Sequence, residues 1–290
     1  MSAPPIRIRI TADDLGWSPE VNEGIARAVR AGTLSAVSVL ATGPAFESGV
    51  GLLREALAGR PPGSVSVGLH LDLTDFRAVA EPAAIPSLVD GEGRFRRRSR
   101  PLMVALLTGA ARVEHVALEL AAQLGRLRAA GLAIGHLDGH RHAHLFPGLS
   151  GVVAGAAREL AFVRTMPLRD PRPIAPAALP ERVALALLSA RLVRALGARF
   201  GARPSDAIAG LAEGRTLESD WIARTVRAAR PGLTEIVTHP GVADSGTVGR
   251  SRGHDRSLDL AALTSPDLAD ALAERGVELV RGDDHRGCAS

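Results

Sequence analysis

A dense series of ionisable side chains occupies every second residue from His136 to His144. Four of the nine histidines in the chain fall in this segment, and the fifth member of the series is Asp138. If the segment is extended, all five side chains point to one face, because side chains alternate along a strand. Imidazole and carboxylate groups bind metals, so the series favours a metal site over histidines scattered in a loop.

The series is too long to form one coordination shell. Eight residue steps of about 3.3 Å span roughly 26 Å, whereas ligand atoms lie within about 2–2.6 Å of a bound ion. One or two of these side chains could therefore hold an ion. The others would support the ligands, contact a substrate or face solvent.

Polar residues also follow other predicted strands. Asp13 and Asp14 come after a first alternating strand, His70 lies near the end of another, and His239 follows a third. Two imidazoles and a carboxylate from different strands suit Zn²⁺ and also accept Mg²⁺, with positions left for water. Such a site supports hydrolysis, in which a second carboxylate accepts the proton of water and a histidine protonates the leaving group.

The neighbouring carboxylates Asp13 and Asp14 can share this work only where the strand turns, because neighbours in a regular strand point to opposite sides. An isolated Asp-Asp pair is more often a helix cap or a turn. Its position shortly before Gly16, together with the other polar strand ends, favours a catalytic site here.

Alternating strands and helices are needed to position these residues. Apolar residues recur with a period of two in the expected strands and with helical spacing between them. The expected strands are residues 6–10, 36–40, 65–71, the histidine segment, 162–165, 235–238 and 277–280. This order and the length predict an α/β fold, a single distorted β/α barrel of about six or seven parallel strands with helices outside. Active sites of such barrels lie at C-terminal strand ends, where the polar residues fall.

Two segments interrupt the alternation, within a single domain expected to span residues 1–290. Residues 75–111 lack a continuous period and contain an arginine-rich run at 94–100, which indicates a lid or insertion. A helical insertion is expected around 167–215, beginning with a proline-rich connection at 167–180. Residues 243–257 are expected to form a polar loop.

The composition is that of a globular enzyme-sized protein, with 46% apolar residues. The chain has no lysine, so its basic residues are all arginine, and the net charge of +4 is weak evidence for nucleic-acid binding. The single cysteine, Cys288, excludes an intramolecular disulfide. Without an apolar leader, a membrane-length apolar run or a glycine-rich phosphate loop, we expect a cytoplasmic enzyme with no membrane span and no nucleotide.

Five motifs, in this order along the chain, resemble those of the YdjC-like carbohydrate deacetylase family. They are TADDLG at 11–16, VNEGI at 21–25, GLHLDLT at 68–74, HLDGHRHAH at 136–144 and HPG at 239–241. The ordered set is far more specific than any one motif. The resemblance implies a distorted β/α barrel, related to polysaccharide deacetylases, that uses one divalent metal ion, Mg²⁺ or Zn²⁺, to remove N-acetyl groups from amino sugars.

The resemblance also implies roles for individual residues. It places Asp14, His70 and His140 on the metal and makes Asp13 the general base. His239 would protonate the departing amine or bind near the acetyl group.

Other residues of the motifs would surround this centre. Arg164 resembles a family arginine that orients Asp13, with a surface arginine as the alternative. His142 and His144 match family histidines that would line the substrate cleft. His136 and Asp138 would support the ligand imidazoles through hydrogen bonds.

Three residues depart from the usual family pattern. Gly139 and Arg141 stand where serine and histidine are usual, and Trp17 stands where an aliphatic residue is common. None is an expected ligand or the base, so the departures concern the choice of sugar. Arg141 could meet a phosphate or carboxylate, and Trp17 could stack on a sugar ring or pack in the interior.

We therefore expect a metal-dependent N-deacetylase that acts on an acetylated amino sugar or oligosaccharide. Metal-bound water would attack the acetamide carbonyl, with Asp13 as base and His239 as acid. The alternative is another metal-dependent hydrolase, such as a phosphohydrolase of a sugar phosphate, with the arginines at 94–100 on the phosphate. A nucleic-acid binder is disfavoured because Phe95 is the only aromatic residue in that run. The alanine-, leucine- and arginine-rich helices would be compatible with a homodimer.

Overall fold

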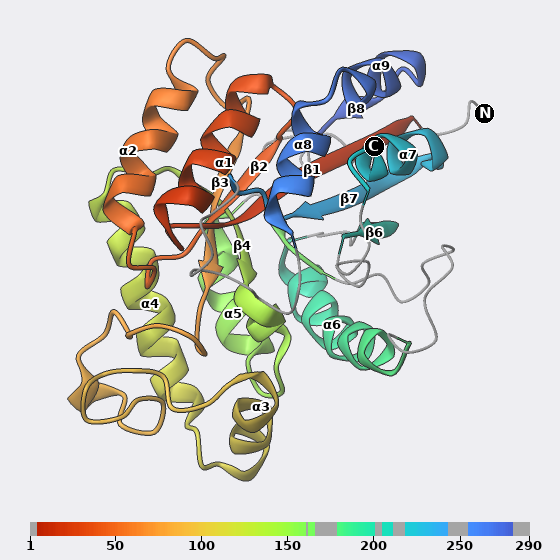
Figure 1. The fold of residues 1–290 in the computed structure, drawn as a ribbon. Helices are drawn as coiled ribbons and strands as arrows, with labels where there is room; N and C mark the ends of the chain where they lie inside the picture. Colours follow the sequence, from red (N-terminus) through yellow and green to blue (C-terminus); the bar gives the residue numbers. More distant parts are fainter. Residues whose placement is uncertain are drawn as a thin grey trace.

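The structure, a computed structural model, describes residues 5–160, 162–165, 179–200, 205–210, 218–242 and 255–280. A sheet runs through the centre of the molecule and the helices lie around it (Figure 1). The strands are β1 (Ile6–Leu15), β2 (Ala36–Val39), β3 (Ser66–Leu71), β4 (Ile134–Gly139), β5 (Phe162–Val163), β6 (Ala207–Ala209), β7 (Gly232–Thr238) and β8 (Glu278–Leu279).

The strands follow the spatial order β5-β4-β3-β2-β1-β7-β6, and β8 pairs with the start of β1. Every pairing between them is parallel. The seven strands of the main path curl into a half-barrel, which confirms the predicted barrel-like α/β fold. Parallel strands place their C-terminal ends at the same edge, so the predicted polar residues meet there.

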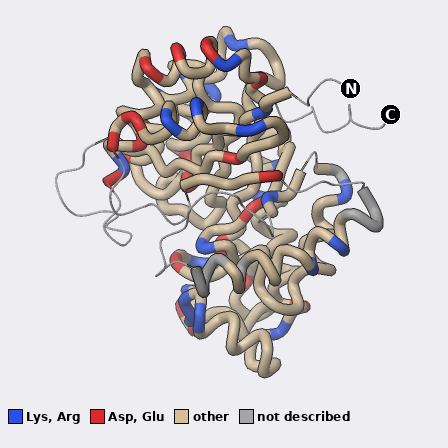
Figure 2. The backbone as a smooth tube through the Cα atoms, turned by 90° about the vertical axis from the view of Figure 1, so that its right-hand side faces the viewer, with Lys and Arg blue, Asp and Glu red and all other residues tan. Residues whose placement is uncertain are grey.

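The helices connect successive strands. They are α1 (Pro19–Ala31), α2 (Phe46–Leu57), α3 (Ser99–Thr108), α4 (Val113–Ala129), α5 (Ser150–Ala156), α6 (Leu179–Phe200), α7 (Trp221–Ala228), α8 (Arg256–Thr264) and α9 (Pro266–Glu274), with 3-10 turns η1 (Pro82–Ala84), η2 (His140–Leu145) and η3 (Ala157–Glu159). None of the helices in the described ranges is both long and apolar enough to cross a bilayer. Basic and acidic residues are interleaved along the described backbone (Figure 2).

Local sequence explains how α1 begins and ends. The hydroxyl of Ser18 accepts a hydrogen bond from the N–H of Val21, and Pro19 occupies the first turn, where its missing N–H is not needed. Gly32 ends the helix with a φ of 83°, a conformation that glycine adopts at low cost.

Apart from β1, which continues to Leu15 beyond the expected residues 6–10, and the histidine segment described below, two elements differ from the sequence prediction. The strand β6 lies inside the range expected to be a helical insertion, because three residues are too few to display a period. The helix α8 begins inside the expected polar loop, where Asp255 caps it by accepting from the N–H of Ser257. The rest of that loop, most of the proline-rich connection and Cys288 lie outside the described residues.

A strap, defined here as residues 75–98, occupies most of the range predicted as a lid and is followed by α3. It is tied to α4 by the buried carboxylate of Glu119, which accepts hydrogen bonds from the N–H groups of Val79 and Ala80 at 3.0 and 2.9 Å. Asp72, just before the strap, accepts from the N–H of Asp75 and thus shapes the turn that leads into it.

The imidazole of His136 on β4 is fully buried. Its Nδ1 lies 2.9 Å from the hydroxyl of Ser66, its Nε2 lies 3.1 Å from the hydroxyl of Ser38, and its ring stacks on Phe162. A Cβ atom on Gly68 would lie 2.3 Å from the ring, so this position has no room for a side chain. Burial is the main reason that the pKa of His136 is lowered to about 3, which keeps the imidazole neutral near pH 7.

The helix α1 makes a close contact with the segment that follows β7. A Cβ atom on Gly24 would lie 2.4 Å from the Cα of Gly241, and the N–H of Val242 donates to the carbonyl of Glu20 at 3.1 Å. The backbone of the segment that carries His239 therefore packs directly against Gly24 of α1.

Substituting alanine for glycine in two helices should have opposite effects. Helix propensity favours alanine over glycine by about 1 kcal/mol. Nothing lies within 4 Å of a Cβ on Gly125 in α4, so Gly125→Ala should raise the free energy of unfolding of the protein. Gly24→Ala instead forces a methyl group against Gly241 and should destabilise by about 1–3 kcal/mol. Urea unfolding measures both values, and an equal gain at the two positions would contradict the close contact.

The neutral state of His136 predicts a specific pH dependence. The unfolded pKa is near 6.5 and the folded pKa near 3, so the unfolded state binds more protons between these values and stability falls as the pH drops through that window. His136→Gln should be less stable at pH 7. Between pH 6 and pH 5, its free energy of unfolding should also fall by about 1 kcal/mol less than that of the wild type, as measured by urea unfolding with a chelator present. Parallel pH profiles for the two proteins would show that this histidine is not held neutral.

Candidate active site

The side chains of Asp13 and Asp14 reach one site because β1 is irregular near its end. The register between β1 and β2 shifts between Ala12 and Leu15, and Asp14 has a left-handed backbone with a φ of 75°. This is the departure from a regular strand that two neighbouring carboxylates need in order to serve one centre. Both side chains are buried.

The structure brings Asp14, His70 and His140 together at the C-terminal ends of β1, β3 and β4. The Oδ1 atom of Asp14 lies 3.4 Å from Nε2 of His70 and 3.2 Å from Nδ1 of His140. One ligand atom from each of the three residues lies within 4.8 Å of the others. Within the described part of the chain, this buried Oδ1 has no hydrogen-bond partner, which fits an oxygen that binds a cation.

Carboxylates hold the outer nitrogen of each imidazole. Nδ1 of His70 lies 2.7 Å from Oδ1 of Asp138, and Nε2 of His140 lies 3.0 Å from Oδ2 of Asp75. A histidine that donates one ring N–H to a carboxylate presents the lone pair of its other nitrogen, as metal-binding histidines do. The donor set of two nitrogens and one oxygen therefore fits a divalent cation such as Zn²⁺ or Mg²⁺.

The site carries an excess of negative charge. Burial alone would lower the pKa of His70, but the carboxylate of Asp13 and its neighbours raise it well above the usual value. The pKa of His140 is also raised, against the effect of burial, with Asp14 as a major cause. Protons and metal ions compete for such ligands, so a bound cation would take the place of these protons.

A second trio, Asp13, His70 and Asp138, also lies within ligand distance. Its two carboxylates are already paired with Arg164, which contacts Asp13 at 2.6 and 2.9 Å and Asp138 at 2.8 Å. The Nε of the same guanidinium donates to Glu235 at 2.7 Å. Both oxygens of Asp13 and of Asp138 already have partners, whereas Oδ1 of Asp14 has no hydrogen bond among the described residues, so the first trio is the better cation site.

Arg164 is not a surface residue, because only 2% of it is exposed. It follows β5, and its N–H donates to the carbonyl of Leu137 at 3.0 Å. Nε2 of His144 lies 2.9 Å from the carbonyl oxygen of Arg164. His144 is itself 1% exposed, so the structure places it behind Arg164 instead of along an open cleft.

The histidine segment does not form the single stripe expected of an extended chain. β4 ends at Gly139, and the chain then turns through η2, where Arg141 and His142 have φ values of 52° and 59°. His140, the first residue of this turn, lies next to Asp14, and His142 is half-buried. The alternation of the sequence could not reveal two left-handed residues.

The two residues expected to support the ligands behave differently. Asp138 contacts His70, as expected. His136 instead contacts the hydroxyls of Ser66 and Ser38 and touches no proposed ligand among the described residues, which corrects the expectation for this position.

The unusual residues Trp17 and Arg141 both lie close to His140. The ring of Trp17 is 5.4 Å from that of His140 and 4.9 Å from that of Phe76 in the strap. Arg141 donates through Nε and Nη2 to Asp75 at 2.6 and 3.2 Å. Both residues are half-buried, so they pack beside His140 and Asp75 and also reach the solvent boundary.

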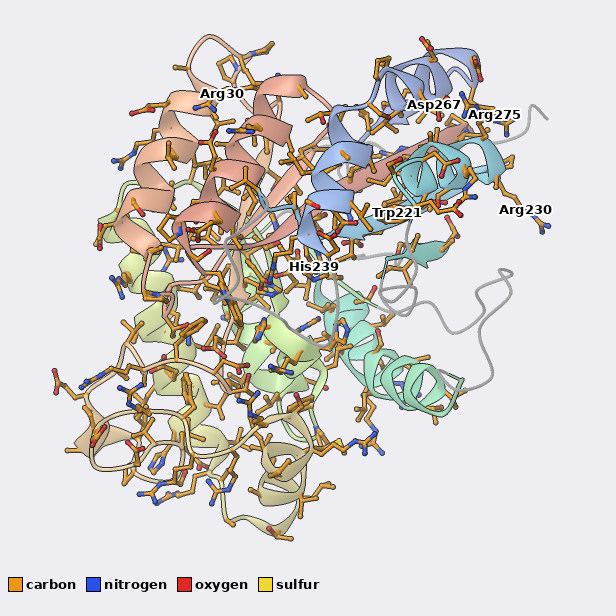
Figure 3. All side chains as sticks on the ribbon, in the orientation of Figure 1. Arg30, Trp221, Arg230, His239, Asp267 and Arg275 are labelled. Atoms are coloured by element: carbon orange, nitrogen blue, oxygen red, sulfur yellow. The ribbon has the colours of Figure 1, made fainter. Side chains whose placement is uncertain are left out.

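His239 lies just beyond the end of β7 and beside the start of α8 (Figure 3). Its N–H donates to Oδ2 of Asp259 at 2.7 Å, and Oδ1 of Asp259 accepts from Nε1 of Trp221 at 3.0 Å. A buried carboxylate on α8 therefore fixes the backbone of this half-buried histidine.

Sequence reasoning missed three charged residues of the site: Asp75, Glu235 and Arg256. A carboxylate inside the apolar strand β7 was a detectable signal for Glu235. Arg256 gave no signal, because it lay in the expected polar loop. Its Nη2 contacts Oδ2 of Asp14 at 2.6 Å, and although burial favours a raised pKa for Asp14, this guanidinium helps to hold it well below its usual value.

Comparisons with known proteins agree with the geometry. A family model described as YdjC-like protein matches residues 7–274. A carbohydrate deacetylase of Mus musculus is 33% identical over 307 aligned positions, covering 98% of this chain and 96% of that protein. A carbohydrate deacetylase of Brevibacillus brevis is 31% identical over 277 positions, covering 95% of this chain and 98% of that protein.

A solved structure shares the fold. It is that of an Enterococcus faecalis protein described as a cellobiose-phosphate cleavage protein, with a TM-score of 0.71 and 22% identity, covering 97% of this chain and 98% of that chain. The family match extends over nearly the whole described barrel and includes every residue of the site. This chain therefore belongs to the YdjC-like protein family.

Proposed function

We propose that the protein is a hydrolase that removes N-acetyl groups from an acetylated amino sugar or oligosaccharide, using one divalent metal ion held by Asp14, His70 and His140. The names of its relatives support carbohydrate deacetylation. The main support for the metal site is the buried Oδ1 of Asp14, which faces two imidazole nitrogens and has no hydrogen bond within the described residues. Mg²⁺ and Zn²⁺ both suit this donor set.

When bound, the cation supplies Lewis acidity that activates water and polarises the acetamide carbonyl. Asp13 lies beside the proposed ligands. Arg164 donates hydrogen bonds to both of its oxygens, which fixes the plane of the carboxylate. Each oxygen keeps a second lone pair, so Asp13 can accept a proton from the attacking water. The water oxygen then forms a bond to the carbonyl carbon.

Breaking the carbon–nitrogen bond requires a proton on the departing nitrogen. His239 is the proposed donor, since it stands at the end of β7 with its backbone held by Asp259. The products are acetate and the free amine of the sugar. Arg141 and Trp17, close to His140, and His142, in the same turn, are the proposed substrate contacts, whereas His144 acts through Arg164.

The arginine run at 94–100 gives little support to a phosphohydrolase. Arg96 and Arg97 donate to carbonyl oxygens of Val89 and Ser87 within the strap. Arg94 pairs with Glu92, and Arg98 lies 3.5 Å from Asp75. A phosphate bound to Arg96 or Arg97 would therefore have to displace contacts that already exist within the strap.

The decisive assay is acetate release by the purified, metal-reconstituted protein across N-acetylated mono- and oligosaccharides, with sugar phosphates run in parallel for phosphate release. Acetate from at least one sugar is the expected result. Phosphate without acetate would replace the proposed reaction with phosphoryl chemistry.

Two substitutions should separate metal binding from catalysis. Asp13→Asn keeps the shape of the base and removes its charge, so it should retain the metal and lose turnover by about 10²–10⁴-fold. His140→Ala removes a ligand and should lose both metal and turnover. Metal content by mass spectrometry and acetate release measure the two effects.

His115→Ala is the matched control, because His115 contacts Ser87 of the strap and takes no part in the proposed centre. It should keep metal and activity. A metal-free Asp13→Asn protein would argue that Asp13 is a ligand, and a fully active one would remove it as the base.

A further inference from the structure

The two carboxylate oxygens of Asp14 have separate partners. Oδ1 faces the imidazoles of His70 and His140, whereas Oδ2 lies 2.6 Å from Nη2 of Arg256. Arg256 is only 9% exposed, so water screens this ion pair weakly. One oxygen is thus available to a cation, and the other is occupied by a guanidinium.

The fold holds Arg256 in this position. The N–H of Gly241 donates to its carbonyl at 3.1 Å, and a Cβ on Gly241 would lie 3.1 Å from the Cβ of Arg256. Its Cζ lies 5.6 Å from the ring centre of Trp17, and its Nη1 is 3.5 Å from the carbonyl oxygen of His239. The guanidinium is therefore fixed between the ligand Asp14 and the segment of the proposed acid.

A carboxylate can bind a cation through one oxygen or through both. We propose that Arg256 is a positioning residue that restricts Asp14 to one metal-binding oxygen and so leaves coordination positions open for water and substrate. This inference rests on the proposed metal site. It adds a residue from α8 to a centre that the sequence motifs assign to β1, β3 and β4.

The charge of Arg256 gives the inference a distinctive consequence. Without a metal, the guanidinium is the counter-charge at Oδ2 of a buried carboxylate, and removing it would leave that charge poorly compensated. Without Arg256, the carboxylate of Asp14 would offer both of its oxygens to a cation and would attract it more strongly. Loss of Arg256 should therefore tighten metal binding while it impairs turnover, whereas loss of a merely structural residue would weaken both.

The test compares Arg256→Met with wild type, using Mn²⁺ as a paramagnetic probe on the full-length metal-free protein. We expect Arg256→Met to bind Mn²⁺ about tenfold more tightly, the scale of a partly screened charge interaction, and to melt at a lower temperature without metal. Its kcat for acetate release should fall by at least about tenfold, because water and substrate lose coordination positions. Arg256→Lys, which keeps a charge near Oδ2, should return the Mn²⁺ affinity toward that of wild type.

Arg227→Met is the control, since Arg227 pairs with Asp267 and Glu274 on α9, away from the site. It should leave Mn²⁺ binding unchanged. Equal or weaker Mn²⁺ binding by Arg256→Met would overturn the role proposed for Arg256. Wild-type protein that binds no Mn²⁺, Mg²⁺ or Zn²⁺ would instead overturn the proposed metal site itself, so the two failures are distinguishable.

Discussion

The buried guanidinium of Arg164 joins three strands of the half-barrel. It contacts Asp13 of β1, Asp138 of β4 and Glu235 of β7, all at distances below 3 Å. Removing such charges from water costs several kcal/mol for each ion unless every one finds a partner. These three strands must therefore keep their relative positions, and this constraint places the proposed base beside His70.

The charges of the same cluster would favour a cation at the proposed metal site. Arg9, 3.7 Å from Glu235, adds a second positive charge, so two guanidinium groups face three carboxylates. One negative charge remains uncompensated near His70, whose raised pKa reflects it. A metal ion at Asp14 would reduce this excess of negative charge. The carboxylate of Asp14 is also paired with the guanidinium of Arg256.

Periodicity and motif order were enough to predict the parallel barrel and to name the residues that gather at its C-terminal edge. Asp14 and His70 lie on separate strands and His140 directly follows a third, yet parallel pairing brings them to one place. Local backbone was not predictable in the same way. The left-handed residues of η2 break the histidine stripe after Gly139, and a strand period carries no sign of them.

Contacts between residues that are distant in sequence were also not predictable from the sequence. Arg256 is separated from Asp14 by 242 residues, and nothing near it in sequence marks it as part of the site. The hydroxyls of Ser66 and Ser38 contact the two nitrogens of His136 because β3 lies next to β4 and β2 follows β3 in the sheet, an order that only the assembled strands reveal. Residue type and spacing thus named candidate residues that the fold brings together, whereas their hydrogen-bond partners required the fold.

Crystals of the wild-type protein grown with Mn²⁺, examined by anomalous scattering, test the central claim most directly. The account predicts one strong anomalous peak within about 2.0–2.3 Å of Oδ1 of Asp14, Nε2 of His70 and Nδ1 of His140, with Oδ2 of Asp14 still on Arg256. A peak between Asp13 and Asp138, or no ordered ion at the C-terminal edge of the barrel, would contradict it.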